Sequence, residues 1–150
     1  SYRDARVRTG LGVDGSASND GSHMLGEARQ AMLLARLAAA PTPTEPPGPV
    51  MPAREALEIA TLGGASVLGR TDVGSLEVGK AADFFAVSLD RLEFAGARHD
   101  PVAALLLCAP VTVDETWVAG RPVVRQGRLT TLDTGELLSL HMRLGAELLS

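Results

Sequence analysis

The run from Thr9 to Asp20, TGLGVDGSASND, constrains the fold of this chain more than any other feature. Apolar residues and glycines alternate up to a single carboxylate at Asp14, and the chain then breaks into Gly, Ser, Asn and Asp. This pattern predicts a short buried strand over 9–14 and a loop over 15–21. Strands of α/β barrels carry catalytic side chains at such ends, where the following loops gather. Asp14 is therefore the first candidate for a catalytic residue.

The rest of the chain predicts a mixed order of helices and strands. Apolar spacing predicts helices over 22–40, 53–61, 100–107 and 134–149, a short further turn over 65–68, and strands over 82–87, 112–118 and 122–125. The segment 41–52, PTPTEPPGPVMP, predicts an exposed loop because proline cannot continue a helix. Asp20 or Ser22 could cap the first helix. Residues 119–121 predict the turn of a hairpin.

Composition excludes several classes of protein. A hydrophobic share of 45% over 150 residues is typical of a folded domain. The formal net charge of −4, without any run of basic residues, argues against a nucleic-acid partner. No stretch is long and apolar enough to cross a bilayer, and Cys108 has no second cysteine with which to form a disulfide. We therefore expect a cytoplasmic protein with neither nucleic-acid nor membrane partner.

The predicted elements do not complete a fold by themselves. A single strand of barrel type cannot be buried by the helices that follow it, because parallel strands need neighbours on both sides. The strands of the second half are too few to close a sandwich. The sequence therefore predicts an α/β chain that forms the tail of a larger protein.

Several motifs, taken in order, resemble one family. The string GVDGSASND resembles the end of the eighth barrel strand in deaminases and chlorohydrolases of the amidohydrolase superfamily. Downstream, ATLGGA and GSLEVGKAAD are similar to the superfamily's second signature, and VAGRPVVRQG resembles its closing hairpin. The strings DGSASNDGSHML, EARQAMLLARL and HDPVAALLLC are most similar to the branch of 8-oxoguanine deaminases and hydroxyatrazine hydrolases.

This resemblance implies a specific fold and division of the chain. The expected fold class is α/β: the C-terminal piece of a (β/α)8 barrel with its last strand and following helices, joined to the C-terminal strands of a small β-sandwich. Residues 1–72 would end the barrel and include the loop 41–52. Residues 73–130 would belong to the sandwich, with a short helix inserted at 100–108, and residues 131–150 would form a terminal helix.

The resemblance also implies a reaction. Members of the family hold one divalent metal, usually zinc and in some cases iron, with a His-x-His pair, one or two further histidines and a final aspartate. Asp14 matches that aspartate, which implies roles as metal ligand and as proton shuttle. Ser16 or Asn19 could contact the substrate from the same loop. The implied reaction removes ammonia from a small amino-substituted heterocycle, such as an 8-oxoguanine-like purine or a triazine, and the full-length protein could be a homo-oligomer.

The chain departs from the family in its histidines. It has no His-x-His pair, and its three histidines, His23, His99 and His141, are expected to be structural. A zinc site takes three or more protein ligands, so this chain alone is expected to be inactive. It could be a natural fragment, a piece of a split enzyme or a truncated reading frame. Two other functions stay open: a related chlorohydrolase or cyclic-amide hydrolase, and a non-catalytic interaction module.

Other polar residues have simpler structural interpretations. Ser16, Ser18, Asn19 and Asp20 are typical of turns and helix caps, because their side chains satisfy free backbone donors. Asp83 is expected to fix the junction between a turn and a strand. Lys80 is predicted to be a turn residue, since GSLEVGK lacks the spacing of a phosphate-binding loop. Cys108 is expected to be buried in an apolar helix.

Overall fold

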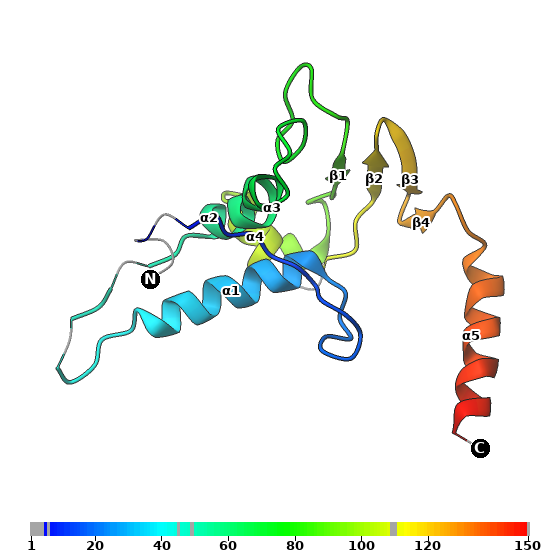
Figure 1. Cartoon of the computed structure of the whole chain (residues 1–150), viewed down its shortest axis with the longest axis horizontal. Helices are drawn as coiled ribbons and strands as arrows, with labels where there is room; N and C mark the ends of the chain where they lie inside the picture. The colour runs from blue at the N-terminus through cyan, green and yellow to red at the C-terminus, as the bar shows by residue number, and fades with distance from the viewer. Residues whose placement is uncertain (1–4, 6, 45, 49, 109–110, 150) are drawn as a thin grey trace. The chain divides into compact units, whose positions relative to one another are not determined.

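The computed structural model describes residues 5, 7–44, 46–48, 50–108 and 111–149 (Figure 1). The chain divides into two compact units. The first comprises Ser1–Lys80 and Leu89–Val111, and the second comprises Ala81–Ser88 and Thr112–Ser150. Within the described residues, no helix is long and apolar enough to cross a membrane.

The described part of the first unit is helical. Its elements, in chain order, are α1 (Met24–Ala38), α2 (Ala53–Glu58), the π-helical turn η1 (Ile59–Gly63), α3 (Gly64–Val67), the 3-10 turn η2 (Leu92–Phe94) and α4 (Pro101–Leu107). The segment between α1 and α2 has no helix or strand in its described residues, as its prolines predict. The sequence predicts that the helix from Ala53 ends before Gly63, but the helical backbone continues from α2 through η1 into α3.

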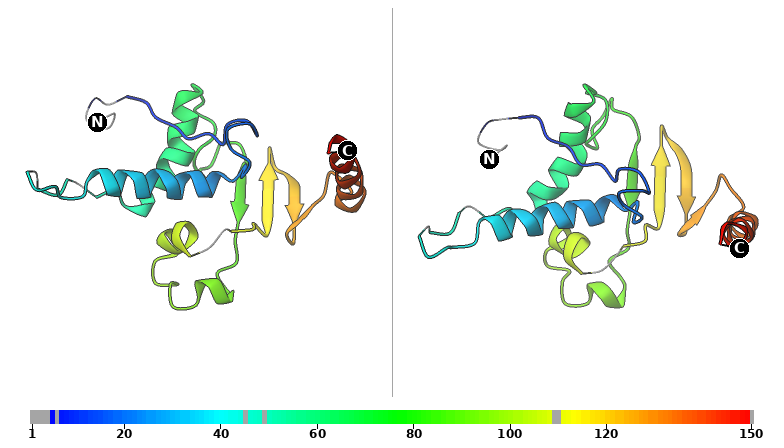
Figure 2. Two further views of the ribbon diagram at one scale, coloured as in Figure 1. Left: turned by 90° about the horizontal axis from the view of Figure 1, so that it is seen from below. Right: turned by 60° about the horizontal axis from the view of Figure 1, so that its bottom comes forward.

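The core of this unit lies where α1, α2 and α4 meet, and Figure 2 shows these helices side by side. Ala28 and Met32, one helical turn apart on α1, are fully buried. They pack with buried side chains from the other two helices and from the segment before α2: Met51, Ala53, Ala56 and Leu106. Small alanines at the contact allow the helices to approach closely. The loop residue Leu11 packs against the same cluster.

The helix caps agree only in part with the sequence. Asp100 caps α4 by accepting a hydrogen bond from the amide of Ala103 at 3.0 Å, and Pro101 follows at the first helical position. The predicted caps of α1, Asp20 and Ser22, are wrong. Its N-cap is His23, whose backbone is extended, whereas Ser22 has a φ of +41°. Cys108, at the end of α4, is exposed rather than buried.

Residues 9–14 do not form the predicted strand. A strand exists through hydrogen bonds to a neighbouring strand, and the described strands of this chain, all in the second unit, pair with one another. The segment also ends at Asp14 in a left-handed conformation, with a φ of +59°, which no strand continues. Asp14 is exposed.

The second unit contains one antiparallel sheet in the order β1-β2-β3-β4. The strands are β1 (Phe84–Ala86), β2 (Glu115–Val118), β3 (Arg121–Arg125) and β4 (Arg128–Leu129). The rings of Phe84 and Trp117, which are partners in the register, stack with centroids 6.0 Å apart. Strand β4 is an addition to the strands that the sequence predicts.

Two tight turns set the register of this sheet. Ala119 and Gly120 join β2 to β3, Gln126 and Gly127 join β3 to β4, and all four have a positive φ. This pair of positive φ values is typical of two-residue type I′ hairpins. The carboxylate of Asp83 accepts a hydrogen bond from the amide of Ala119 at 2.6 Å, which confirms its predicted structural role.

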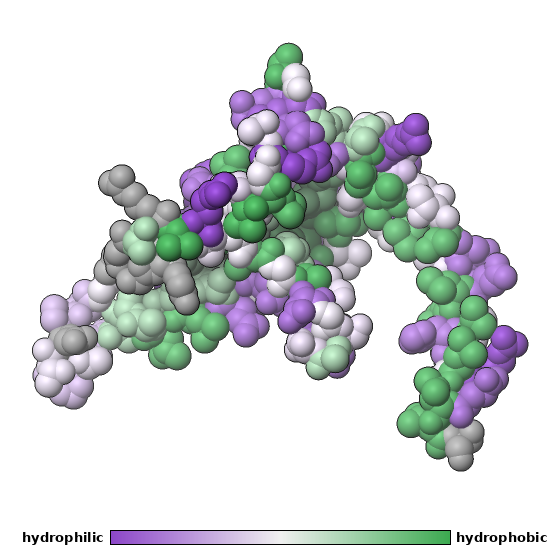
Figure 3. Space-filling view, in the orientation of Figure 1, coloured by the Kyte–Doolittle hydropathy of each residue, from purple (hydrophilic) through white to green (hydrophobic). Residues whose placement is uncertain are grey.

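The predicted terminal helix is present as α5 (Thr134–Leu148), capped by Asp133. Its leucines are exposed, for example Leu138 at 59% and Leu148 at 87%. Figure 3 shows apolar side chains along one side of α5 and polar side chains along another. A helix of this kind normally covers an apolar surface.

Candidate functional site

Asp14 lies on an exposed turn with its carboxylate only partly used. Its Oδ1 accepts a hydrogen bond from the amide of Gly15 at 2.8 Å. In the part of the chain that the structure describes, this is the only hydrogen bond of the side chain, so Oδ2 can accept a proton or bind a cation. The left-handed backbone at Asp14 turns the chain away from the segment 9–13 and into the following loop.

Asn19 holds the loop after Asp14 onto helix α1. Its Nδ2 donates to Oε1 of Glu27 at 2.6 Å, and its Oδ1 accepts from the amide of Gly21 at 3.0 Å. The amides of Ser18 and Asn19 both bond to the carbonyl of Gly15 at 2.9 Å. Asn19, named from the sequence as a substrate contact, therefore has both ends of its amide occupied by the protein.

A cleft of about 380 Å³ brings several of these groups together. It is lined by the end of the segment 9–14, the loop and the first two turns of α1: Gly12, Val13, Asp14, Ser18, Asn19, Glu27 and Gln30. Two predicted site residues, Asp14 and Asn19, thus share one cleft. Ser16, the third, is exposed and is not among the residues that line it.

Glu27 and Gln30 also line this cleft, although the sequence analysis does not predict them as site residues. Their positions in the first turns of an amphipathic helix suggest only capping and solvent exposure. A contact between a loop and a helix depends on the path of the chain between them, so no local pattern identifies it.

His23 is structural, as expected. Its Nδ1 accepts from the amide of Gly26 at 2.9 Å, and its Nε2 lies 3.0 Å from the carbonyl oxygen of Val111. Because Nδ1 accepts, the hydrogen of the neutral ring is on Nε2, which donates to Val111. Both ring nitrogens are occupied, so neither is available to a metal.

The described residues do not form a metal centre by themselves. They contain no group of three or more His, Cys, Asp or Glu side chains placed to hold one ion. Asp14 offers a single carboxylate, and Glu27 in the same cleft is bonded to Asn19. Three protein ligands are the minimum of a catalytic zinc site. No step through a metal can therefore be derived from these residues alone.

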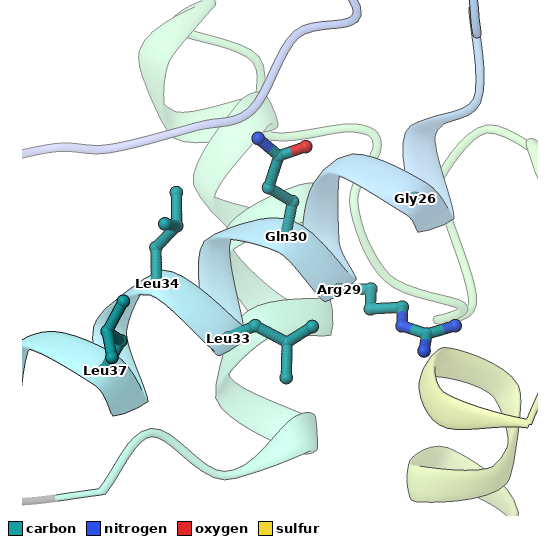
Figure 4. Close-up of a pocket in the computed structure, with 6 residues that line it drawn as sticks. All are labelled: Gly26, Arg29, Gln30, Leu33, Leu34 and Leu37. Atoms are coloured by element: carbon teal, nitrogen blue, oxygen red, sulfur yellow. The ribbon is translucent and has the colours of Figure 1, made fainter. Parts of the chain in front are cut away.

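A second cavity, on α1, differs in chemistry from this cleft. It is lined by Gly26, Arg29, Gln30, Leu33, Leu34 and Leu37, and Figure 4 shows that these residues all lie on one helix. Leu34 and Leu37 are 56% and 72% exposed. The cavity has leucines and no acid, so it suits packing rather than catalysis.

The turn-rich segment 70–80 contains two carboxylates, those of Asp72 and Glu77, whose pKa values are lowered. The Arg70 guanidinium, which donates to Asp72 at 2.9 and 2.6 Å, lowers the pKa of that carboxyl. A hydrogen bond from the Ser75 hydroxyl, and then one from the Lys80 ammonium, lower the pKa of Glu77. Lys80 thus stabilises a turn, as predicted.

Comparison with known proteins connects the chain to a family. The sequence pattern of the amidohydrolase family matches residues 2–123. The chain is 44% identical over 141 residues to an 8-oxoguanine deaminase of Pseudomonas aeruginosa, covering 94% of this chain and 30% of that protein. It is 46% identical over 136 residues to a hydroxydechloroatrazine ethylaminohydrolase of Pseudomonas sp. strain ADP, covering 89% and 27%.

Solved structures give the same relationship. An atrazine chlorohydrolase from Arthrobacter aurescens complexed with zinc matches with a TM-score of 0.84 and 36% identity, over 95% of this chain and 31% of that one. An adenosine deaminase from Xanthomonas campestris with bound zinc matches with a TM-score of 0.83 and 35% identity, over 97% and 32%. The chain spans about 30% of the length of such relatives.

Proposed function

The chain belongs to the amidohydrolase family, and on this premise we propose that it is the C-terminal part of a metal-dependent hydrolase that deaminates a small nitrogen heterocycle. One observation carries the proposal: a chain that is 44% identical to an 8-oxoguanine deaminase over 94% of its length has an exposed aspartate, Asp14, at a polar cleft. The substrate class follows from such relatives: an 8-oxoguanine-like purine or a triazine.

The proposed division of the chain follows the same relationship. Residues 1–72 end the barrel, residues 73–130 belong to a β-sandwich and residues 131–150 form a terminal helix. The exposed leucines of α1 support this division, because a barrel helix needs an apolar surface of the barrel beneath it. The unpaired segment 9–14 supports it too, because a last barrel strand pairs with strands that lie earlier in a barrel protein.

Asp14 is proposed to hold a divalent metal, zinc by analogy with the zinc-bound relatives, together with ligands from outside these residues. When bound, such a metal would supply Lewis acidity, which would make a water molecule nucleophilic near neutral pH. The Asp14 carboxylate accepts a proton from the attacking water and returns it to the departing nitrogen. The ring carbon gains an oxygen, its bond to the amino nitrogen breaks and ammonia leaves.

The natural polypeptide that carries this sequence provides the test. It should contain a divalent metal and release ammonia from 8-oxoguanine or an amino-triazine. Asp14→Asn should lower kcat by about 10²–10⁴-fold, the range for loss of a general acid–base group, and should also lower the metal content. The matched control is Asp20→Asn, which removes a carboxylate from the same loop and should leave both unchanged. Full activity in Asp14→Asn would refute the proposal.

A related hydrolase is the second candidate, because solved relatives include an atrazine chlorohydrolase. The products of the reaction decide between these candidates. A chlorohydrolase releases chloride from a chlorinated triazine, a cyclic-amide hydrolase opens a ring, and a deaminase releases ammonia. A polypeptide that contains no metal and turns over none of these substrates would instead be a non-catalytic module.

A further inference from the structure

The segment that leads to Asp14 lies directly on the backbone of η1 and α3. A Cβ added at Gly63 would lie 2.3 Å from the carbonyl oxygen of Thr9, and a Cβ added at Gly10 would lie 2.9 Å from the Cα of Gly64. Both distances are too short for real Cβ contacts, which begin at about 3.0 Å. The two backbones therefore approach more closely than any side chain would allow. Figure 2 shows the N-terminal segment passing beside these helical turns.

This contact is specific to one side of the helical turns. A Cβ at Gly64, the next residue, would meet nothing within 4 Å. Gly63 and Gly64 are both helical, with φ values of −61° and −57°, so alanine suits the backbone of either. They differ in what a methyl group would touch, which makes them a matched pair.

Few other contacts hold the segment between Gly10 and Asp14. Among the backbone hydrogen bonds of the described residues, none involves residues 10–13. Leu11 packs against the core, and the next polar anchor is the bond between Asn19 and Glu27, beyond Asp14. Among the described residues, the glycine contact and the hydrogen bond from Arg8 to the carbonyl oxygen of Ser66 at 3.3 Å hold the segment before Asp14, and the pair of Asn19 and Glu27 holds the loop after it.

We propose that Gly10 and Gly63 are positioning residues for Asp14: their missing side chains set how deeply the segment 9–14 lies on η1 and α3, and so where the Asp14 carboxylate stands. The inference rests on the proposed function, in which that carboxylate holds a metal and moves a proton. Neither glycine lines the cleft that contains Asp14. They act through the backbone that carries the aspartate.

The expected effect follows from the distances. Ordinary van der Waals contact for a Cβ begins at 3.4 Å, so the methyl group of Gly63→Ala falls about 1 Å short of the room it needs. A misplacement of roughly 1 Å at a reacting group costs on the order of 10²-fold in rate. Part of the displacement can be absorbed by the helix, so a loss of about 10–100-fold in kcat is expected. KM should change much less, because the substrate contacts of other segments stay in place.

The experiment compares Gly63→Ala, Gly10→Ala and Gly64→Ala in the natural polypeptide. Three quantities are measured: kcat and KM for ammonia release, the metal-to-protein ratio, and hydrogen exchange of the backbone amides of residues 10–15. The expected order of loss in kcat and metal content is Gly63→Ala, then Gly10→Ala, with Gly64→Ala unchanged. Exchange over 10–15 should rise in the same order.

The outcomes separate this inference from the proposed function. If Asp14→Asn abolishes activity while Gly63→Ala and Gly64→Ala behave alike, the inference is wrong and the function stands. If Asp14→Asn is active, the function itself fails. Should Gly63→Ala not fold, Gly10→Ala decides, because its milder overlap still predicts lower kcat and metal content than Gly64→Ala. A fall in thermal stability alone, with kcat and metal content intact, would also overturn the inference.

Discussion

Replacing His23 with alanine is expected to destabilise the first unit by about 2 kcal/mol. The ring makes two hydrogen bonds, one to the amide of Gly26 at 2.9 Å and one to the carbonyl oxygen of Val111 at 3.0 Å. Loss of a helix cap costs about 1 kcal/mol. Loss of the hydrogen bond to the carbonyl oxygen of Val111, a buried residue, costs about 1 kcal/mol more. Together they change the unfolding equilibrium by roughly 30-fold.

Two further variants test this reasoning. The asparagine of His23→Asn can still cap the helix but is too short to reach Val111, so about half of the free energy of unfolding lost in His23→Ala should be regained. His99→Ala removes an exposed ring that makes one hydrogen bond, to the carbonyl of Gly96 at 3.2 Å, and should change stability by less than about 0.5 kcal/mol.

The assay is urea unfolding followed by circular dichroism, with hydrogen exchange of the Gly26 amide as the local measurement. His23→Ala should unfold at lower urea and exchange this amide faster. Equal urea midpoints for His23→Ala and His99→Ala would refute the argument, because it requires both bonds of His23 to form in the folded state.

Two other predictions concern turns. The pKa of Glu77 should lie below its ordinary value of 4.5. The hydrogen bonds of its carboxylate therefore stabilise the folded turn above pH 4.5, and this stabilisation is lost as the pH falls through the lower pKa of the folded state. An NMR titration of Glu77 should show the lowered pKa, and Ser75→Ala should return it toward 4.5. Ala119→Gly should stabilise the hairpin of the second unit by about 1 kcal/mol, because Ala119 has a φ of +49° that glycine adopts without strain; an unchanged or lower midpoint in thermal unfolding would contradict it.

Local sequence patterns predicted most of the elements. The spacing of apolar residues is enough to identify α1 and α5, because a helix is set by contacts three and four residues apart. The hairpin between β2 and β3 follows from Ala119 and Gly120 for the same reason: its geometry depends on two adjacent residues. Asp14 could be proposed as a site residue because the string around it resembles a family motif.

Patterns failed where the outcome depends on distant partners. The segment 9–14 has the composition of a strand but no neighbouring strand among the described residues, so it stays unpaired. His23 became the cap of α1 partly because Val111 holds its ring from the other side. The side-chain amide of Asn19 donates a hydrogen bond to Glu27 on α1, a contact between loop and helix that no local pattern predicts.

The sequence by itself determined the helices α1, α4 and α5, the hairpin of β2 and β3, and that an aspartate follows an apolar, glycine-spaced segment. Only the tertiary structure decided how that aspartate is held: by a segment resting on Gly63 on one side and by a loop bonded to Glu27 on the other. The physical reason is that helices and tight turns depend on neighbours in the chain, whereas the place of a carboxylate depends on close contacts between segments far apart in it.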